Sequence, residues 1–389
     1  MDLSVKFGGL SCPNPVWASA GPLTDTYEKM ERCIEAGIGG IVTKTIKDDP
    51  EKSFPRPRLK VYESRPKKLP LIGLQNIDGY SEIPIETWKT WVVRLKREHG
   101  SIPVIASITS GDPQKLGELA AQVESFGADA IQLDLSCPHH FLLGTGSGST
   151  NSDLTKVYVE TVKKRVKVPV IQKLTYNVAD ITAIAKASAE AGIDGLVPID
   201  TVRSLVGIDI EKGQPLLPAF GGLSGSVIKP LALFSVASVA KAVNVPLSAS
   251  GGIMIWRDAV EFMMAGATTV QLCTAVMFGG YKVIKEVVGG IAQFMEEKGY
   301  ERPSDFIGVA LPHLRPTVWD VPGRPPFEIS VNEETCAKNC QRCVDACLAA
   351  GFAAIVRNPE AAVIDLDKCD GCGLCIGVCP TNSIVFQAK

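Results

Sequence analysis

Residues 103–136, PVIASITSGDPQKLGELAAQVESFGADAIQLDLS, decide the fold class. Two apolar runs, PVIASI (103–108) and AIQLDLS (130–136), are typical of buried strands, and a polar stretch separates them. Within that stretch the apolar residues follow the 3.6-residue period of a helix; they are Leu116, Leu119, Val123 and Phe126. The order strand, helix, strand predicts a unit with parallel strands.

The same alternation continues on both sides of this unit, from Val16 to about Tyr300. The other strand candidates are VWASA (16–20), GIVTKT (40–45), VIQKLT (170–175), GLVPID (195–200), PLSASGG (246–252) and TVQLCTA (269–275). Eight strand–helix units in about 300 residues predict an α/β fold of the (β/α)8 or TIM-barrel type over residues 1–300. A doubly wound sheet is the rival, but it usually has a glycine-rich nucleotide turn after its first strand, and GPLTD (21–25) is not one.

Three further segments complete the predicted organisation. PRLKVYE (57–63) and PLIGLQN (70–76) are interpreted as a hairpin in the long loop after the second strand, where ligand contacts are often built. Residues 301–330 contain six prolines and little periodicity, which predicts a linker wrapping the barrel. Residues 331–389 form a second, small domain whose own apolar core would be marginal.

Composition narrows the class of protein. The 389 residues carry a formal net charge of −2, and the lysines and arginines are scattered, which argues against a nucleic-acid partner. No stretch is apolar for the length that a bilayer requires, and MDLSVKFGG (1–9) lacks the features of a signal peptide. We expect a soluble, cytoplasmic protein.

The cysteines point to iron–sulfur clusters. Eight of the twelve fall between Cys336 and Cys379, and CDGCGLCIGVCP (369–380) matches the C-x2-C-x2-C-x3-C-P pattern of bacterial ferredoxins. The first run departs from this pattern, with one extra residue between Cys336 and Cys340 and with Leu348 in place of proline. A looped turn can absorb that residue, so we expect a 2[4Fe-4S] ferredoxin domain.

In such domains the fourth cysteine of each run serves the other cluster. One cluster is therefore expected on Cys336, Cys340, Cys343 and Cys379, and the other on Cys347, Cys369, Cys372 and Cys375. Two structural zinc sites with four thiolates each are the alternative. The cubane spacing favours iron–sulfur clusters, and these transfer single electrons.

Because iron–sulfur clusters transfer one electron at a time, the barrel needs a cofactor that accepts two electrons as a hydride and releases them singly. A flavin does this. GGLSG (221–225), SGG (250–252) and CTA (273–275) follow the last three strands, where a barrel commonly binds phosphate. Lys44 and Lys173 lie within apolar strands, which is unfavourable unless they are paired or functional. Beside a flavin such cations would stabilise its anionic reduced form.

The combination LSCPHH, TKT, LTYN, IDTV, GGLSG, SGGI and CTAV resembles the dihydroorotate dehydrogenase and dihydropyrimidine dehydrogenase superfamily. With the ferredoxin domain the chain is most similar to the catalytic subunits of bacterial NAD-dependent dihydropyrimidine dehydrogenases. The resemblance implies FMN on the barrel and pyrimidine metabolism as the setting. The implied FMN contacts are Ser19, Lys44, Thr45, Lys173, Gly225, Ser250, Gly251, Gly252, Cys273 and Thr274.

The resemblance also implies the reaction. Cys137 of LSCP matches the family's general acid/base, which moves a proton at one carbon of a C=C or C–C bond while flavin moves a hydride at the other. Without the resemblance, a cysteine at a strand end is more often an inert small apolar residue. The implied substrate contacts are Asn76, Asp134, Leu135, Ser136, Asp200 and Thr201.

Two of these contacts depart from the family pattern, because Asp134 and Asp200 replace asparagines. An asparagine offers a donor and an acceptor to the imide edge of uracil, whereas an ionised aspartate only accepts. We therefore expect a heterocycle richer in N–H donors than uracil. Protonated aspartates, which would restore a donor, are the alternative that keeps uracil or thymine as substrate.

Two other functions compete with this one. Dihydroorotate oxidation is weakened by the integral ferredoxin domain and by two aspartates that would repel the carboxylate of orotate. A pure electron-transfer module is disfavoured by Cys137 and the lysines in the strands. No G-x-G-x-x-G opens a helix after a strand, so electrons should pass to or from a partner. That partner is an FAD/NAD(P)H subunit or a ferredoxin, in a homo-oligomer or hetero-oligomer.

Overall fold

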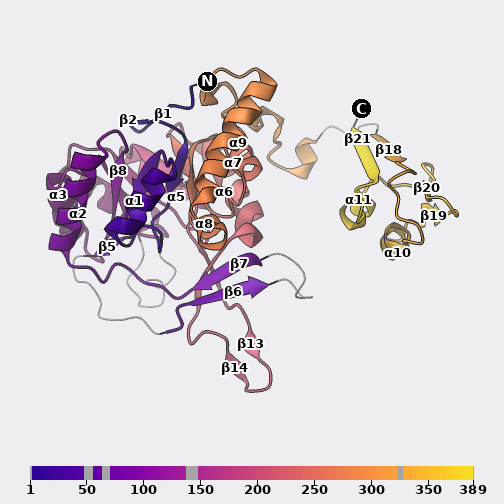
Figure 1. Ribbon diagram of the computed structural model, residues 1–389, viewed down its shortest axis with the longest axis horizontal. Helices are drawn as coiled ribbons and strands as arrows, with labels where there is room; N and C mark the ends of the chain where they lie inside the picture. Colours follow the sequence, from indigo (N-terminus) through magenta and orange to yellow (C-terminus); the bar gives the residue numbers. More distant parts are fainter. Residues whose placement is uncertain (1, 48–55, 64–70, 137–147, 322–326, 389) are drawn as a thin grey trace. The chain divides into compact units, whose positions relative to one another are not determined.

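The computed structural model describes residues 2–47, 56–63, 71–136, 148–321 and 327–388 (Figure 1). The chain divides into two compact units, Met1–His313 and Leu314–Lys389. The division falls inside the predicted linker 301–330. The first part of that segment belongs to the barrel unit, since Phe306 is fully buried and Gly308 and Ala310 donate backbone hydrogen bonds to Met263 and Met264.

Eight parallel strands form the barrel of the first unit. Strand β4 pairs with β3 on one side and with β8 on the other, which closes the ring. The strands are β3 (Val16–Ala18), β4 (Gly40–Val42), β8 (Val104–Thr109), β9 (Ala130–Asp134), β10 (Val170–Lys173), β11 (Gly195–Val197), β16 (Leu247–Ala249) and β17 (Ala267–Leu272). Each overlaps one of the eight predicted runs, so the predicted TIM barrel is confirmed.

A helix follows each strand and covers the outside of the ring (Figure 1). The predicted face of α3 is confirmed, because its four periodic apolar residues are 6% exposed or less. Asp112 begins this helix by accepting from the backbone N–H groups of Gln114 and Lys115. The helices are α1 (Tyr27–Glu35), α2 (Ile85–Glu98), α3 (Pro113–Ser125), α4 (Ser152–Lys163), α5 (Ile181–Glu190), α6 (Lys229–Ala242), α7 (Trp256–Met264), α8 (Thr274–Gly279) and α9 (Lys282–Lys298).

The interior of the barrel changes from apolar to polar along its axis. The hairpin of β1 (Val5–Phe7) and β2 (Leu10–Cys12) packs with Trp17, Ile105 and Ala130 in one apolar cluster. Further along β8, in the same alternating register as Ile105, lies Ser107, which hydrogen-bonds Thr45. Burial of polar side chains is therefore concentrated toward the carboxyl ends of the strands.

A four-stranded antiparallel sheet is inserted into the barrel unit. The predicted hairpin is confirmed as β6 (Leu59–Glu63) and β7 (Leu71–Asn76), and β15 (Gly221–Ser224) and β12 (Val202–Ser204) extend it. Residues 221–224 of the predicted phosphate turn are thus a strand. The other short elements are β5 (Ile46–Lys47), β13 (Ile208–Asp209), β14 (Gln214–Pro215), η2 (Ser226–Ile228), η3 (Pro303–Asp305) and η4 (Leu311–His313).

In its described residues the second unit contains two antiparallel strand pairs, two short α-helices and one 3-10 turn. Its elements are η5 (Val318–Asp320), β18 (Phe327–Val331), α10 (Arg342–Ala349), β19 (Ile355–Arg357), β20 (Ala362–Ile364), α11 (Leu374–Val378) and β21 (Ile384–Ala388). Strand β18 pairs with β21, and β19 with β20. The cysteines Cys343, Cys347 and Cys375 are part of its small core. Among the helices that the structure describes in either unit, none is long and apolar enough to cross a membrane.

Candidate functional site

The candidate active site is a cavity at the carboxyl ends of the barrel strands, with about 1080 Å³ of empty space that includes open solvent. Seven of the eight strands contribute a residue at or just beyond their last position, as expected for a TIM barrel. These residues are Ser19, Lys44, Asp134, Lys173, Asp200, Ser250 and Cys273.

All ten residues predicted to contact FMN line this one cavity, as do Asn76, Asp134, Asp200 and Thr201 of the predicted substrate set. Leu135 and Ser136 do not line it. Leu135 is 4% exposed and packs in the main core, while the fully buried Ser136 contacts two lining aspartates. Cys137 lies outside the described residues.

Lys44 is paired by a residue that the sequence analysis missed. Its Nζ donates to Asp78 Oδ2 at 2.5 Å, and the side chains are 10% and 12% exposed. The other oxygen of Asp78 lies 3.0 Å from Arg58 Nη1. Asp78 follows Asn76 closely in GLQNID, which was the available signal. The carboxylate neutralises the buried lysine and joins the end of β4 to the start of the inserted hairpin.

Asp134 and Asp200 share one hydroxyl group. Ser136 Oγ lies 3.0 Å from Asp134 Oδ1 and 2.8 Å from Asp200 Oδ2, although a serine has a single hydrogen to donate. Thr45 Oγ1 donates to Asp134 Oδ2 at 2.7 Å. Lys173 Nζ lies 3.8 Å from Asp200 Oδ1, so a cation lies beside this carboxyl pair.

Asn76, the third predicted recognition residue, is held by the backbone. Its Nδ2 donates to the carbonyl of Gly222 at 3.0 Å, and its Oδ1 accepts from the N–H of Asp78 at 3.3 Å. The second N–H of the amide is left to face the cavity that Asn76 lines. The register of β7 against β15 therefore fixes the orientation of this side chain.

Glycine is required at the far wall of the cavity. Gly225, Gly251 and Gly252 have φ angles of 92°, 89° and 86°, which residues with a side chain rarely adopt. A Cβ on Gly252 would lie 2.7 Å from Lys229 Cα, and one on Gly225 would lie 2.9 Å from the backbone of Gly73. The wall is thus bare backbone, as a phosphate group requires for close approach.

Other lining residues also fit FMN. Gln271 Nε2 donates to Ser248, but its buried Oε1 has no partner among the described residues, so it can receive an N–H from a ligand. The hydroxyls of Thr274 and Ser224 meet at 2.8 Å beside Gly225. Gln271 and Ser224 were not predicted, because a glutamine in a strand and a serine in a turn are common in ordinary cores.

Cys273 is an improbable proton donor at this wall. Burial raises its pKa to about 11, against the opposing effect of Lys44 and Lys173. Burial likewise raises the pKa values of Cys12 and Cys33 to about 12. These three thiols stay protonated at neutral pH and are weak acids. The role predicted for Cys137, which lies outside the described residues, stays a prediction.

The first predicted cysteine quartet surrounds one cavity of the second unit. Cys336, Cys340, Cys343 and Cys379 line it together with Arg357, so the fourth cysteine of the second run does lie with the first run. Burial opposes ionisation of Cys379, but N–H groups of Thr381 and Ser383 and the Thr381 hydroxyl outweigh it and lower the pKa to about 7. Thiolates are the form that binds iron.

The second quartet involves the other ends of α10 and α11. Cys347 accepts from the backbone N–H of Ala354 at 3.3 Å. The pKa of Cys375 is raised by burial and then by the nearby Cys369 and Cys372. Cys369 and Cys372 thus lie near Cys375, as thiolate ligands of one cluster would. The second cluster, on these three cysteines and Cys347, stays a prediction.

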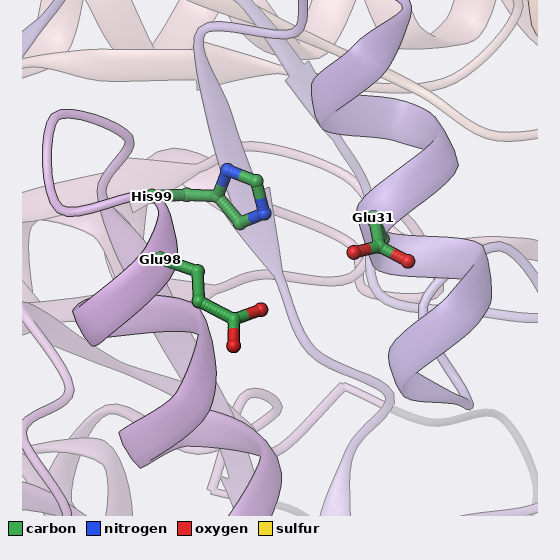
Figure 2. A group of neighbouring side chains, drawn as sticks. All are labelled: Glu31, Glu98 and His99. Atoms are coloured by element: carbon green, nitrogen blue, oxygen red, sulfur yellow. The ribbon is translucent and has the colours of Figure 1, made fainter.

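A different group of potential ligands, Glu31, Glu98 and His99, lies between α1 and α2 (Figure 2). The Glu98 carboxylate already accepts from Tyr27 at 2.6 Å and from Arg97 at 2.7 Å, as well as from Arg94. The bond from Tyr27, followed by those from the two arginines, lowers the pKa of Glu98 to about 2. Since a metal ion would have to displace two cations, this group is a surface ion-pair network.

Comparisons with known proteins agree with this geometry. Residues 2–295 match the family model described as dihydroorotate dehydrogenase, and residues 362–385 match the 4Fe-4S binding domain. A crystal structure of DHODH from Eimeria tenella, in complex with ferulenol, superposes with a TM-score of 0.68 at 21% identity. It covers 81% of this chain and 89% of that one, and it supports the fold.

Two relatives differ in how much of the chain they cover. The catalytic subunit of dihydroorotate dehydrogenase B (NAD(+)) from Pyrococcus horikoshii is 39% identical over 310 residues, which are 79% of this chain and 98% of that one. Subunit PreA of the NAD-dependent dihydropyrimidine dehydrogenase from Escherichia coli (strain K12) is 31% identical over 398 residues, 98% of this chain and 95% of its own. The chain therefore belongs to the dihydroorotate dehydrogenase family and carries a 4Fe-4S binding domain in its C-terminal part.

Proposed function

We propose that the protein is an FMN and iron–sulfur oxidoreductase that reduces or oxidises a C=C or C–C bond in a pyrimidine-like nitrogen heterocycle. The observation that carries this proposal is the convergence of all ten predicted FMN contacts on one cavity that also holds Asp134 and Asp200. The E. coli relative, a dihydropyrimidine dehydrogenase subunit, shares both parts of the chain.

The lining residues divide between cofactor and substrate. Gly225, Gly251 and Gly252 provide the bare wall for the FMN phosphate. Lys44 and Lys173 contact the flavin ring as hydrogen-bond donors, and Asp78 balances the charge of Lys44. FMN, when bound, supplies hydride transfer and can pass electrons on singly. Asn76, Asp134 and Asp200 orient the heterocycle, and Cys137 moves the proton at the second carbon.

The substrate is proposed to be richer in N–H donors than uracil. Ser136 cannot donate its one hydrogen to Asp134 and Asp200 at once. Thr45 donates its one hydrogen to Asp134 Oδ2 at 2.7 Å, and the Ser107 hydroxyl 2.9 Å away can donate to Thr45 in turn. Asp200 also accepts from the backbone N–H of Thr201 at 2.7 Å. An amino or ring N–H group on the substrate would supply a donor to the carboxylate that Ser136 does not serve.

Electrons are proposed to pass between the flavin and a partner through two [4Fe-4S] clusters, held by the two cysteine quartets. The partner is an FAD/NAD(P)H subunit or a ferredoxin. The "NAD-dependent" and "subunit" in the name of the E. coli relative support the first of these. Assembly with such a subunit, or with further copies of the chain in the cytoplasm, belongs to the same proposal.

The test follows flavin reoxidation. Anaerobically purified protein is reduced with dithionite, and uracil, thymine, orotate and a set of amino-substituted pyrimidines are added one at a time. We expect rapid reoxidation by an amino-substituted ring and slow reoxidation by uracil. Rapid reoxidation by uracil or thymine would reject the donor-rich substrate, and no reoxidation by any heterocycle would favour a pure electron-transfer module.

Variants separate the roles of the residues. The double variant Asp134→Asn/Asp200→Asn restores the amides typical of the family, and we expect it to gain reactivity with uracil. Cys137→Ala should retain FMN and lose reoxidation by substrate, whereas Cys33→Ala, which changes a buried thiol in α1, should retain both. Equal loss in both cysteine variants would contradict the role proposed for Cys137.

Dihydroorotate oxidation is a second candidate, because the archaeal relatives are named as dihydroorotate dehydrogenase subunits. Their similarity covers 79% and 80% of this chain. Reoxidation by orotate faster than by every other heterocycle would favour this function over the one proposed.

A further inference from the structure

Arg357 contacts one of the predicted cluster ligands directly. It is the last residue of β19 and lines the cavity of the first cysteine quartet. Its Nη1 donates to Cys336 Sγ at 3.3 Å, and its Nη2 donates to the carbonyl of Ala337 at 2.9 Å. The two arms of one guanidinium thus hold a ligand sulfur and the backbone next to it.

The same contact involves the irregular part of the cysteine pattern. The gap between Cys336 and Cys340 has one residue more than the ferredoxin pattern, and the structure places Asn339 in it with a φ of 62°. The N–H of Cys340 turns back to the carbonyl of Ala337 at 3.3 Å. Arg357 therefore fixes the carbonyl around which the widened loop turns.

The positive charge of Arg357 distinguishes the two quartets electrostatically. An added electron increases the negative charge on the ligand sulfurs, and a cationic donor stabilises this charge more than a neutral one. In the second quartet, Cys347 accepts from the neutral backbone N–H of Ala354 at 3.3 Å. The cluster beside Arg357 should therefore be reduced more readily.

We propose that Arg357 raises the reduction potential of the cluster on Cys336, Cys340, Cys343 and Cys379 above that of the cluster on the second quartet. The cluster of the first quartet would then hold an electron in preference to the cluster of the second quartet. The electron comes from the donor of the proposed function, and no bond or proton is exchanged. This inference rests on the two clusters of that proposal.

The test is a redox titration of the full chain, followed by electron paramagnetic resonance, with iron measured on the same samples. Arg357→Gln removes the charge, Arg357→Lys keeps it, and Lys368→Gln removes a charge that is 63% exposed and paired with Asp365. In Arg357→Gln we expect one cluster to become about tenfold harder to reduce, a shift of ~59 mV for one electron. Arg357→Lys should recover most of that shift, and Lys368→Gln should leave this potential unchanged.

Three outcomes would overturn the inference in different ways. Two clusters with unchanged potentials in Arg357→Gln would reject the role of Arg357 and leave the proposed function standing. An equal shift of the same reduction potential in Lys368→Gln would show that the potential responds to the net charge of the domain and not to the contact between Arg357 and Cys336. Iron for a single cubane in the unaltered chain would reject the two-cluster proposal and the inference together.

Discussion

Replacement of Asp78 by asparagine tests the buried ion pair of the candidate site. Asp78 accepts from Lys44 at 2.5 Å and lies 3.0 Å from Arg58. The substitution keeps the shape of the side chain and one hydrogen-bond acceptor but removes the negative charge. Lys44 is then left as a cation at the end of a barrel strand without its counter-charge.

The expected loss in the free energy of unfolding follows from how exposed Lys44 and Arg58 are. The side chain of Arg58 is 37% exposed and can regain water, whereas that of Lys44 is 10% exposed and cannot. Removal of one partner from a buried pair destabilises a protein by ~3–5 kcal/mol. Because the asparagine still accepts a hydrogen bond, we expect the lower end, ~3 kcal/mol, which is about two powers of ten in the unfolding equilibrium.

Guanidinium unfolding of the flavin-free protein, followed by the fluorescence of the buried tryptophans Trp17 and Trp88, measures this loss. Asp25→Asn is the matched control, because Asp25 pairs with Lys29 at 2.6 Å with both side chains at least 32% exposed. That control should change the free energy of unfolding by less than ~1 kcal/mol.

A double variant locates the cause of the loss. Lys44→Met in the Asp78→Asn background removes the stranded cation, so we expect it to recover most of the lost stability. If Asp78→Asn behaves like Asp25→Asn, or if the double variant is less stable than the single one, then the lysine is not held as described and the reasoning is refuted.

Three further predictions concern the cavity wall and the ionisable groups. Gly252→Ala, whose Cβ would clash with the first turn of α6, should abolish retention of FMN on gel filtration, whereas Gly289→Ala in α9, which has open space, should retain it. Since the pKa of Cys273 is raised to about 11, mass spectrometry after brief iodoacetamide treatment should find this thiol unmodified at neutral pH and labelled only as the pH approaches 11; labelling at neutral pH would contradict the raised pKa. Because the pKa of Glu98 is lowered to about 2 in the folded state, its contribution to stability is complete above the ordinary value of 4.5 and is lost as the pH falls toward 2. Glu98→Gln should accordingly lower the melting temperature at pH 7 and converge with the unaltered protein near pH 2, and a constant difference across this range would exclude the ion-pair network as its source.

The predicted strands were longer than the observed ones mostly at their carboxyl ends. GIVTKT predicts a strand over 40–45, whereas β4 ends at Val42, and GLVPID predicts 195–200, whereas β11 ends at Val197. The residues beyond these two strands include the buried, β-branched Thr43, Thr45 and Ile199, so local pattern cannot separate them from the strand. In the structure these residues lie in the loops after β4 and β11, and Lys44 and Asp200 among them line the cavity.

The features that depend on local spacing could be predicted from the amino-acid sequence alone. Eight buried apolar runs separated by helical periods specify a parallel barrel, because only strands covered on both faces can be so continuously apolar. The intervals between cysteines specify iron–sulfur ligation, because a cubane needs thiolates at a narrow range of separations. The resemblance of short motifs identified the residues of one site before any geometry was available.

Which of these residues contact one another could not be predicted from the sequence and is seen in the folded structure. Ser136 meets Asp200 across 64 positions of sequence, Lys44 meets Asp78 across 34, and Arg357 reaches Cys336 across 21. Such pairings depend on barrel closure and on the register of paired strands, which bring distant segments together. Neither segment carries a repeating sequence pattern that reveals the contact. The placement of charged side chains in the cavity and beside the first cysteine quartet therefore depends on the folded structure.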